Sequence, residues 1–487
     1  MQPRPRAVVV GGGIAGLTAA HLLADTHDVV VLEQADRVGG KLRRDEVAGV
    51  LVDTGAEAML NRRPEGVELA RDLGLEVVHP ALASSRIWTR GALRPLPRSM
   101  MGVPLDLAEL AASGVLSAEG LERVRREPSL PPYSLEGDPS VGDLVAERLG
   151  DEVVERLVEP LLGGVYAGHA RRISARAALP QLVAYAERGS LLEQAAAMPV
   201  TYDRPVFAGI PGGMGLLPDA LAASGRFEVR TGVTVRRVVS TGSTSEGGVV
   251  STGSTSEGGV VSTGSTSEGG GSTSEGGGFR LTVGPTTGPE LFEADRVVLA
   301  TPAAATARLL ADLAPGAARE LAGIESASVA VVTFAFRSAD VPAVVRESSG
   351  FLVPPVEGRA IKASTFWATK WGWVADAGRA AGGLTFLRTS LGRAGEQTAL
   401  QVPDEELVRR SREDLAEAIG LTAEPVDTHV QRWGGGLPQY APGHLDRVAR
   451  VRAAVAAVPG LSVCGAAYDG VGVPAVIGSA RRATMEA

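Results

Sequence analysis

The sequence predicts an α/β protein built around a parallel sheet, and three observations near its start carry that prediction. Residues 8–10 form a short β-branched run typical of a buried parallel strand. Residues 11–16 follow at once with the spacing G-x-G-x-x-G and open a helical pattern. A second apolar strand, residues 29–32, ends at the acid Glu33. Together these features predict a Rossmann-like unit that binds a dinucleotide.

Each glycine of this loop has its own physical role. Gly11 permits the tight turn, Gly13 lets the backbone approach a pyrophosphate, and Gly16 lets the helix pack closely on the sheet. Gly12, Ile14 and Ala15 complete the loop, so the phosphates are expected at the start of the helix, where N–H groups and the macrodipole favour negative charge. The carboxylate of Glu33 is expected to accept hydrogen bonds from a ribose.

Composition excludes several other classes of protein. The chain has 487 residues, 44% of them hydrophobic, which is enough for two or three domains with large cores. A net charge of −8 without a basic block argues against nucleic-acid binding. The single cysteine, Cys464, excludes an internal disulfide, and no metal site is predicted. The chain enters its first strand without an apolar targeting segment, so a cytoplasmic location is expected.

Two further motifs identify the dinucleotide. Residues 37–41 read RVGGK, and residues 53–55 read DTG. With GGGIAG and an acid before RVGGK, they resemble the N-terminal signature of the flavin amine-oxidase superfamily. That resemblance implies FAD as the cofactor. Gly40 and Lys41 would then run alongside FAD, while the backbone at Gly55 and Ala56 would approach its flat ring.

The segments after this unit are expected to contain both helices and strands. Residues 67–77 suit a short helix and turn, and residues 84–104 suit a β-hairpin, because Pro95 and Pro97 make a helix costly. The chain is then helix-rich to about residue 171, with apolar residues at helical spacing.

A low-complexity segment interrupts the order at residues 240–278. The unit STGSTSEGGVV recurs there and consists mostly of Gly, Ser and Thr, which cannot bury a core. It lies between two strand-like segments, residues 228–239 and 279–283, and is therefore predicted to be a disordered extension of a hairpin tip.

Deleting this repeat is expected to leave the cofactor and the activity intact, because the repeat contributes nothing to a core. The flavin content and turnover of a variant without it would be measured beside those of the full chain. A deletion variant that lost its flavin would show that the hairpin placement is wrong.

The remaining segments return the chain to the cofactor. Residues 294–305 suit a strand that runs into a turn and a helix, and residues 313–440 supply several strands. Residues 461–465 form another strand, after which a glycine turn at residues 470–474 opens the last helix. The start of that helix is expected to stabilise the negative charge of reduced flavin.

We therefore predict a Rossmann-like FAD-binding domain of the two-dinucleotide-binding type, an α+β substrate domain and a helical module. The FAD-binding domain is predicted from residues 1–66, 209–312 and 455–487. The substrate domain is predicted from residues 67–77, 172–208 and 313–454. The helical module is predicted at residues 78–171, a region that corresponds to the membrane-contacting part of related enzymes.

Several longer tracts narrow the resemblance. They include VEPLLGGVYAG (158–168), PGGMGLLPDAL (211–221), RWGGGLPQY (432–440) and AAYDGVGVPAVI (466–477). With these tracts the chain resembles the water-soluble bacterial protoporphyrinogen/coproporphyrinogen oxidases along nearly its whole length, apart from the repeat.

The resemblance implies an oxygen-dependent FAD oxidoreductase acting on CH–CH groups in haem biosynthesis. The expected reaction converts coproporphyrinogen III to coproporphyrin III, with O2 as acceptor and H2O2 as by-product. The expected alternative is protoporphyrinogen IX oxidation. More distant alternatives are an amine oxidase, a desaturase or a non-catalytic carrier on the same scaffold. A ferrochelatase is the expected recipient of the product.

The resemblance also implies site residues. Arg86 stands where related enzymes place an arginine that pairs with a substrate propionate, Tyr166 is a candidate wall of the substrate cavity, and Lys370 is a weak catalytic candidate. The flavin itself is expected to carry the chemistry. The residues expected to bind FAD are Gly11, Gly12, Gly13, Ile14, Ala15, Gly16, Glu33, Gln34, Gly40, Lys41, Gly55, Ala56, Glu57, Ala58, Val235, Trp433, Val471, Gly472 and Val473.

Overall fold

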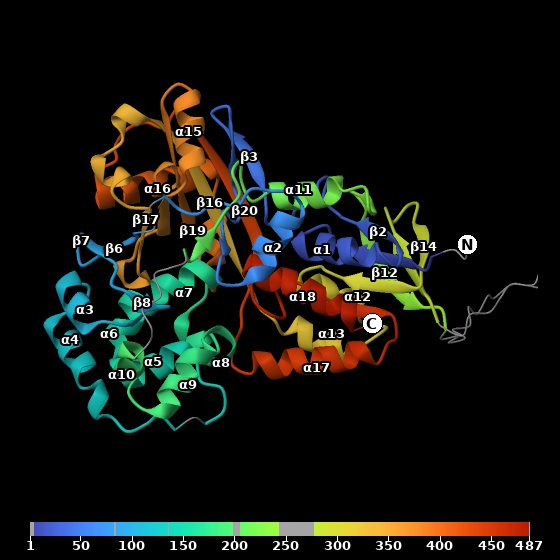
Figure 1. The fold of residues 1–487 in the computed structure, drawn as a ribbon, viewed down its shortest axis with the longest axis horizontal. Coiled ribbons are helices and arrows are strands. Elements are labelled where there is room, and N and C mark those ends of the chain that lie inside the picture. The colour runs from blue at the N-terminus through green and yellow to red at the C-terminus, as the bar shows by residue number, and fades with distance from the viewer. Residues whose placement is uncertain (1–3, 82–83, 135, 198–204, 243–276, 487) are drawn as a thin grey trace, which may run out of the picture.

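The fold is seen in a computed structural model that describes residues 4–81, 84–134, 136–197, 205–242 and 277–486. A parallel sheet and its covering layers occupy one end of the molecule (Figure 1). A second sheet and a group of helices occupy the other end. Segments from the beginning, middle and end of the sequence meet in the parallel sheet.

The parallel sheet has five strands in the order β11-β2-β1-β15-β21, and every neighbouring pair is parallel. In chain order this is 3-2-1-4-5, the strand order of Rossmann-type sheets. The predicted α/β fold is therefore confirmed. The strands are β1 (Arg6–Val10), β2 (Asp28–Leu32), β11 (Glu228–Arg230), β15 (Arg296–Leu299) and β21 (Leu461–Val463).

Successive side chains of the buried strands point alternately to the two faces of the sheet, and each face packs on its own hydrophobic layer. Ala7 and Val9 of β1 face a layer of helices, whereas Val8 and Val10 face the opposite layer. The first layer contains α1 (Ile14–Leu23), α2 (Pro64–Asp72), α11 (Leu216–Ala223) and α18 (Val473–Met485). The second contains β12 (Val235–Ser240), β13 (Phe279–Val283), β14 (Glu290–Ala294), α12 (Ala303–Leu309), α13 (Pro315–Ala322) and α17 (His444–Ala456).

The hairpin predicted around the repeat is present, but the predicted strand 228–239 is two strands. Only β12 belongs to the hairpin, because β11 pairs with β2 in the parallel sheet. Strands β12 and β13 are antiparallel, and Ser240 pairs with Phe279. The amide of Thr241 donates to the carbonyl of Gly278 at 2.8 Å, so the two strands are still joined where the repeat begins and ends. Residues 243–276, which make up most of the predicted disordered segment, lie outside the described residues.

The second sheet has seven strands in the order β20-β16-β19-β18-β17-β6-β7, and only β17 and β6 pair in parallel. One face packs on α16 (Asp404–Ile419) through Phe334 and Leu415. The strands are β6 (Arg86–Thr89), β7 (Ala92–Pro95), β16 (Ser326–Arg337), β17 (Gly350–Leu352), β18 (Ile361–Phe366), β19 (Leu384–Leu391) and β20 (Asp427–Pro438).

Short elements join the two sheets. They are the hairpin of β3 (Arg44–Val47) with β4 (Val50–Asp53), the pair β5 (Met59–Leu60) with β10 (Phe207–Ala208), and the helices α14 (Trp367–Lys370) and α15 (Gly372–Ala380). The tryptophans Trp367 and Trp371 pack with Val52 of β4 in one cluster, which fastens these elements to each other.

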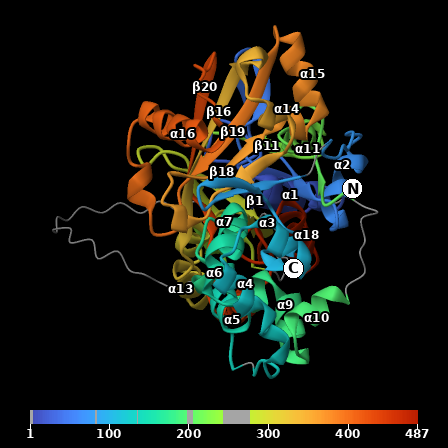
Figure 2. The ribbon, with the colours of Figure 1, turned by 90° about the vertical axis from the view of Figure 1, so that its left-hand side faces the viewer.

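The helical module lies below the seven-stranded sheet in both ribbon views (Figures 1 and 2). Its helices share one buried cluster, at whose edge Arg148 and Glu127 form a buried ion pair. The elements are β8 (Ser99–Met100), β9 (Val103–Pro104), α3 (Leu107–Ser113), α4 (Ala118–Arg125), α5 (Val141–Leu149), α6 (Asp151–Val153), the π-helical η2 (Val154–Val158), α7 (Glu159–Tyr166), α8 (Ala175–Ala178), α9 (Pro180–Arg188) and α10 (Leu191–Ala196).

The structure groups the chain differently from two of the predicted boundaries. The hairpin β6–β7 belongs to the seven-stranded sheet instead of the predicted module at 78–171, because β6 hydrogen-bonds along the edge of β17. Helices packed on the module's core continue to Ala196, beyond the predicted end. Sequence periodicity identifies such elements, but it does not reveal which core they join. The division into three domains remains a prediction.

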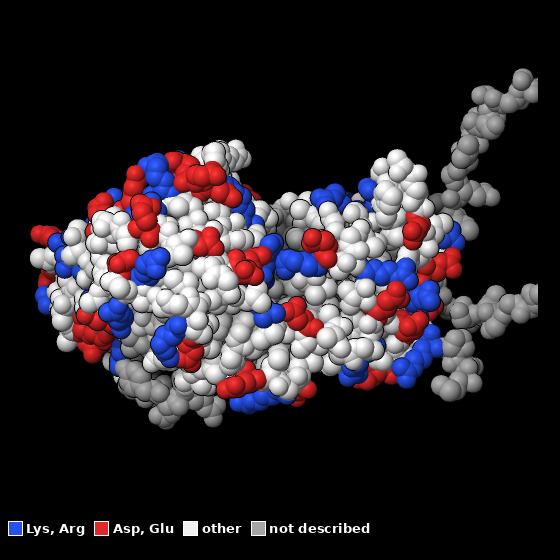
Figure 3. All heavy atoms as spheres, turned by 90° about the horizontal axis from the view of Figure 1, so that it is seen from above, with Lys and Arg blue, Asp and Glu red and all other residues white. Residues whose placement is uncertain are grey.

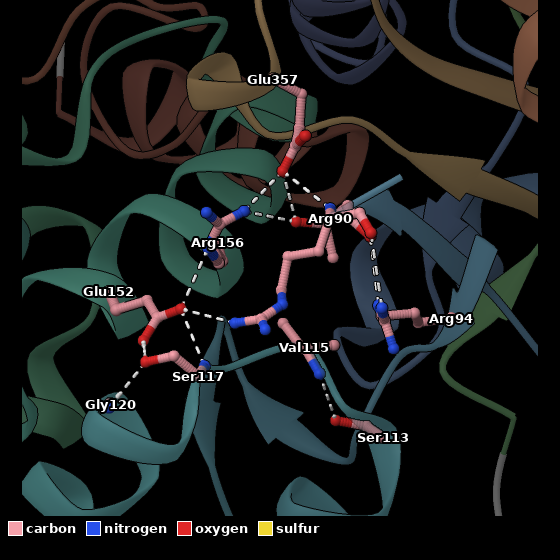
Figure 4. Close-up of polar contacts among 10 residues, drawn as sticks. Arg90, Arg94, Ser113, Val115, Ser117, Gly120, Glu152, Arg156 and Glu357 are labelled. Atoms are coloured by element: carbon pink, nitrogen blue, oxygen red, sulfur yellow. Dashed lines mark hydrogen bonds and ion pairs between the residues drawn. The ribbon is translucent and has the colours of Figure 1, made fainter. Parts of the chain in front are cut away.

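Polar contacts fasten the module to the hairpin and the sheet (Figure 4). Arg156 of η2 pairs with Glu357, which also accepts hydrogen bonds from the Thr89 hydroxyl at 2.6 Å and the Arg90 amide at 3.1 Å. Arg156 and Arg90 both pair with Glu152, at 3.2 and 3.5 Å. Arg90 thus has a structural role at this junction.

The surface carries both signs of charge. Basic and acidic side chains are interspersed over the face shown in Figure 3. Within the parts of the chain that the structure describes, no helix combines the length and the apolar character needed to cross a bilayer.

Candidate active site

The glycine loop connects β1 to α1 and has the geometry that its sequence predicts. Gly11 has φ +110°, a conformation that side-chain-bearing residues rarely adopt. A Cβ on Gly16 would lie 1.9 Å from the carbonyl oxygen of Gly11, so only glycine allows the helix to pack this closely. A Cβ on Gly13 would meet nothing within 4 Å, so the backbone there faces open space into which a ligand can come close.

The RVGGK segment packs directly on this loop. The amide of Gly39 donates to the carbonyl of Gly12 at 2.8 Å, and a Cβ on Gly40 would lie 3.3 Å from Gly13 Cα. The Glu33 carboxylate accepts the Gly12 amide at 2.5 Å and the Ala35 amide at 2.8 Å. Two segments separated by more than twenty positions thus form one rigid wall, with a half-buried carboxylate at the end of β2.

Two helices begin beside this wall without side-chain caps. Gly13 is the N-cap of α1 and Gly472 is the N-cap of α18, so no N-cap side chain accepts the first N–H groups of either helix. Helices α1 and α18 pack in the same layer, where Val473 and Ile14 share one cluster. Because the first turn of a helix has unsatisfied N–H groups, both starts can donate to an anionic or electron-rich ligand.

A third segment brings Lys41, Gly55 and Trp433 together. The carbonyl of Lys41 accepts the amide of Ala56 at 3.0 Å, and a Cβ on Gly55 would lie 2.0 Å from that carbonyl. The indole of Trp433 donates to the carbonyl of Thr54 at 3.4 Å. The Lys41 side chain is exposed, yet desolvation by the surrounding protein lowers its pKa, which indicates a partly enclosed position.

Glu57, Lys370 and Arg388 form an ionic cluster next to Gly55. Glu57 Oε1 lies 2.6 Å from Lys370 Nζ, and Glu57 Oε2 lies 3.2 Å from Arg388 Nη2. Arg388 also donates to the carbonyl of Gly55 at 2.7 Å and lies over the Trp367 ring. Burial favours a neutral Glu57, but Arg388 and Lys370 outweigh it and hold the Glu57 pKa below its usual value.

Asp53 lies behind this cluster. Its carboxylate is 2% exposed and accepts the amides of Met214 and Gly215 at 2.9 and 3.3 Å. It thereby joins the DTG and PGGMG segments. Burial raises the Asp53 pKa to about 7 despite these two hydrogen bonds.

This raised pKa predicts a loss of stability between acid and neutral pH. Folded Asp53 keeps its proton up to about pH 7, whereas the unfolded residue loses it near the ordinary aspartate pKa of 3.8. The folded state therefore holds the extra proton in this range, and stability falls by at most about 1.4 kcal/mol per pH unit as pH rises. Asp53→Asn should flatten that slope in denaturant unfolding measured from pH 4 to 8. The exposed control Asp340→Asn should keep the slope, and an equal slope in all three proteins would rule out the assignment.

The other predicted contacts lie around these groups. Gln34 is exposed directly after Glu33, and Ala58 packs near the Trp367 cluster. Val235 begins β12, two residues after Val233, whose amide donates to the carbonyl of Glu33 at 2.8 Å. Their roles toward a cofactor stay predictions.

Tyr166 lies at the end of α7, between the module and the last glycine turn. Its ring is 7% exposed and lies 5.6 Å from the Tyr440 ring, and Val471 packs against the same cluster. Burial raises the Tyr166 pKa to about 12, so its hydroxyl stays protonated near neutral pH. This position is compatible with the predicted cavity wall.

Arg86 is not brought to the same surface. Its nearest carboxylate is Glu347, at 3.4 Å, and the pair is largely open to solvent. Across the sheet Arg86 lies in one row with Phe351, Ser364 and Thr389. Since Thr389 bonds to Ser411 of α16, that row faces α16, whereas Arg388 projects from the other face. The assignment of Arg86 to substrate stays a prediction, and this geometry does not support it.

The structure buries or largely buries four charged residues that the sequence motifs do not point to. The sequence presents Asp53 only as part of DTG, and its motifs assign no role to Arg388, Lys362 or Arg393. The available signal was a charge inside or next to an apolar strand, as in LTFLRTSL and IKASTF, because buried charges need a partner or a ligand.

The wall, the two uncapped helices and the strand order together define a dinucleotide-binding oxidoreductase fold. A family model for flavin containing amine oxidoreductases matches residues 14–487, and the chain belongs to this family. FAD is therefore its cofactor. The open backbone at Gly13 and the uncapped helix starts fit a dinucleotide with a flat ring system.

Individual relatives agree with this result. A coproporphyrinogen III oxidase of Mycobacterium tuberculosis H37Rv is 37% identical over 495 residues, covering 99% of this chain and 97% of the relative. A coproporphyrinogen III oxidase of Bacillus subtilis is 29% identical, with 99% and 97% covered. A crystal structure from Exiguobacterium sp. 255-15, provisionally named protoporphyrinogen oxidase, is 30% identical with a TM-score of 0.80, covering 99% of this chain and 98% of that one.

Proposed function

We propose that this protein oxidises coproporphyrinogen III to coproporphyrin III, with O2 as acceptor and H2O2 as product. The observation that carries the proposal is full-length similarity to coproporphyrinogen III oxidases in a chain whose glycine wall and helix starts suit FAD. The full reaction removes six electrons and six hydrogens from the macrocycle in three two-electron steps. Each step reduces one O2 to H2O2.

When bound, FAD supplies the chemistry by accepting a hydride from a bridging carbon of the substrate. The residues of this chain then bind the cofactor and the substrate, orient them and shield them from water. The start of α1 binds the pyrophosphate, and Glu33 accepts hydrogen bonds from a ribose. The start of α18 donates N–H groups and the positive end of its dipole to the ring system.

The Glu57 cluster has a positioning role in this proposal. Glu57 holds Lys370 and Arg388 in place, and Arg388 fixes the carbonyl of Gly55. Lys370 Nζ also lies 5.3 Å from the centre of the Phe207 ring. Since the cluster is charged and largely buried, it keeps the backbone at Gly55 rigid where a flat ring must pack.

Protoporphyrinogen IX is the second candidate substrate, and the Exiguobacterium structure favours it by name. The two substrates differ in charge, because protoporphyrinogen has two propionates and coproporphyrinogen has four. The test is turnover of both porphyrinogens side by side, followed by porphyrin fluorescence and H2O2 release. A higher kcat/KM for coproporphyrinogen is expected. Preference for protoporphyrinogen would reject the proposal, and flavin reduction by an amine alone would indicate an amine oxidase.

The setting in the cell is part of the proposal. A cytoplasmic enzyme that passes its product to a ferrochelatase accords with the substrate class. Membrane contact by the helical module is tested by flotation with liposomes of neutral and anionic lipid. Protein that stays at the bottom of the gradient with both lipids would reject that contact.

A further inference from the structure

Lys362 is a buried lysine whose ammonium group has no partner among the residues that the structure describes. Its side chain leaves β18 at a bulge between Ile361 and Ala363, where the pairing register with β19 shifts. The residue is 6% exposed, and within the described residues its ammonium group makes no hydrogen bond or ion pair. A buried ammonium group without a counter-charge costs free energy, so it either loses its proton more readily or gains an anionic partner.

Arg393 is a second buried cation beside it. It follows β19, is 7% exposed and lowers the Lys362 pKa through repulsion. Its guanidinium has only distant partners: it donates to the carbonyl of Val353 at 3.4 Å and lies 3.8 Å from the carboxylate of the half-exposed Glu396. Arginine has five N–H donors, so most of this donor capacity is unused.

The surrounding acids do not neutralise the pair. Glu159 already accepts the Ala170 amide at 2.9 Å, and burial raises its pKa toward the neutral form. Burial, with the nearby Arg393, lowers the Lys362 pKa to about 7. The other titratable groups near Arg393 and Glu159 are His169, Arg171, Glu396 and Asp414.

The two cations lie where the module meets the sheet. Glu159 opens α7, which packs on β18. The residue after Arg393 is Ala394, whose amide bonds to the carbonyl of Ala167 at the end of α7 and whose side chain packs in one cluster with Trp433. Ala330 of β16 and Ile361 of β18 both pair with Leu391 of β19, and the neighbouring Val329 pairs with Trp433. Lys362 and Arg393 therefore lie at the same end of the sheet as Trp433.

We propose that Lys362 and Arg393 form a carboxylate subsite that binds a propionate of the porphyrinogen substrate. This inference rests on the proposed function, because it assigns the counter-charge to the substrate. Arg393 is suited to bind a carboxylate through two parallel N–H groups, and Lys362 adds a point charge. The subsite also explains why the described residues give Lys362 no partner and give Arg393 only the distant carboxylate of Glu396.

The test compares Lys362→Met, Lys362→Arg and Arg337→Met. The third variant removes a charge at the exposed end of β16 on the same sheet and serves as the matched control. Steady-state kinetics with coproporphyrinogen III are measured together with equilibrium binding of coproporphyrin III and of its tetramethyl ester. Binding is followed by fluorescence and does not depend on turnover.

Lys362→Met should raise KM about 10- to 100-fold with kcat unchanged, the effect of losing one charge-assisted hydrogen bond from uniform binding. It should weaken coproporphyrin binding by a similar factor and leave ester binding unchanged. Lys362→Arg should restore most of the affinity, and Arg337→Met should match the wild type. Because the pKa of free Lys362 is lowered to about 7, KM of the wild type should rise above neutral pH, and Lys362→Arg should abolish this rise.

Several outcomes would overturn the subsite. Unchanged KM and unchanged coproporphyrin binding in Lys362→Met with full flavin would do so. Failure of that variant to fold would do so as well, because it would show that the fold needs the ammonium group. Failure of the proposed function has a different signature: a wild type that turns over no porphyrinogen. If that wild type still binds coproporphyrin through Lys362, the carboxylate subsite stands without the oxidase reaction.

Discussion

Replacing Gly16 by alanine is expected to produce a colourless protein without bound flavin. The new Cβ would lie 1.9 Å from the carbonyl oxygen of Gly11, and neither backbone segment can yield without opening the glycine loop. Helix α1 would be pushed away from β1, and its N–H groups would lose their aim at the pyrophosphate. Overpacking of this kind also costs about 1–3 kcal/mol of stability. Flavin absorbance per protein and thermal unfolding measure the two effects.

Gly288→Ala is the matched control for this prediction. Gly288 lies in the turn between β13 and β14, and a Cβ there would meet nothing within 4 Å. That variant should be as yellow and as stable as the wild type. A Gly16→Ala protein with one flavin per chain would show that the loop is more plastic than its packing indicates.

Replacing Glu57 by glutamine is expected to lower stability by about 3–5 kcal/mol, because it leaves Lys370 and Arg388 largely buried without their counter-charge. The carbonyl of Gly55 would lose its fixed partner as Arg388 moves, so flavin affinity should fall as well. Denaturant unfolding of the apo-protein separates the first effect from flavin binding, and flavin titration measures the second.

The control for this change is Glu347→Gln, which breaks the solvent-exposed pair with Arg86. Exposed ion pairs contribute about 0–1 kcal/mol, so this variant should be nearly as stable as the wild type. Equal stability losses in both variants would mean that the Glu57 cluster is not the buried network described. A raised KM for porphyrinogen in Arg86→Met would support the predicted substrate role of Arg86.

Much of the cofactor half was predictable because its signals are local. The glycine spacing at residues 11–16 requires a tight turn and a close helix, and the β-branched runs on either side require buried strands. The hairpin around the repeat was predictable for the same reason, since strand patterns flank a segment that cannot form a core. The uncapped start of α18 followed from the glycine turn before it.

The charged residues of the other half were not predictable in this way. Arg86 was assigned to substrate from its position before a hairpin, but the side of the sheet it faces depends on the row it shares with Phe351 and Thr389. Arg393 and Lys362 are separated by a helix pair and a strand, and nothing in their local sequence indicates that both are buried beside one another.

The sequence by itself determined the strand, glycine loop and helix at its start, the cofactor class and the glycine turn that opens α18. The tertiary structure alone decided the partners: β6 beside β17, Glu57 between Lys370 and Arg388, and the unpaired Lys362 beside Arg393. The physical reason is the distance along the chain over which each kind of interaction acts. Backbone conformation and burial periodicity depend on neighbours within a few positions, whereas the energy of a buried charge depends on whichever distant group the fold brings to it.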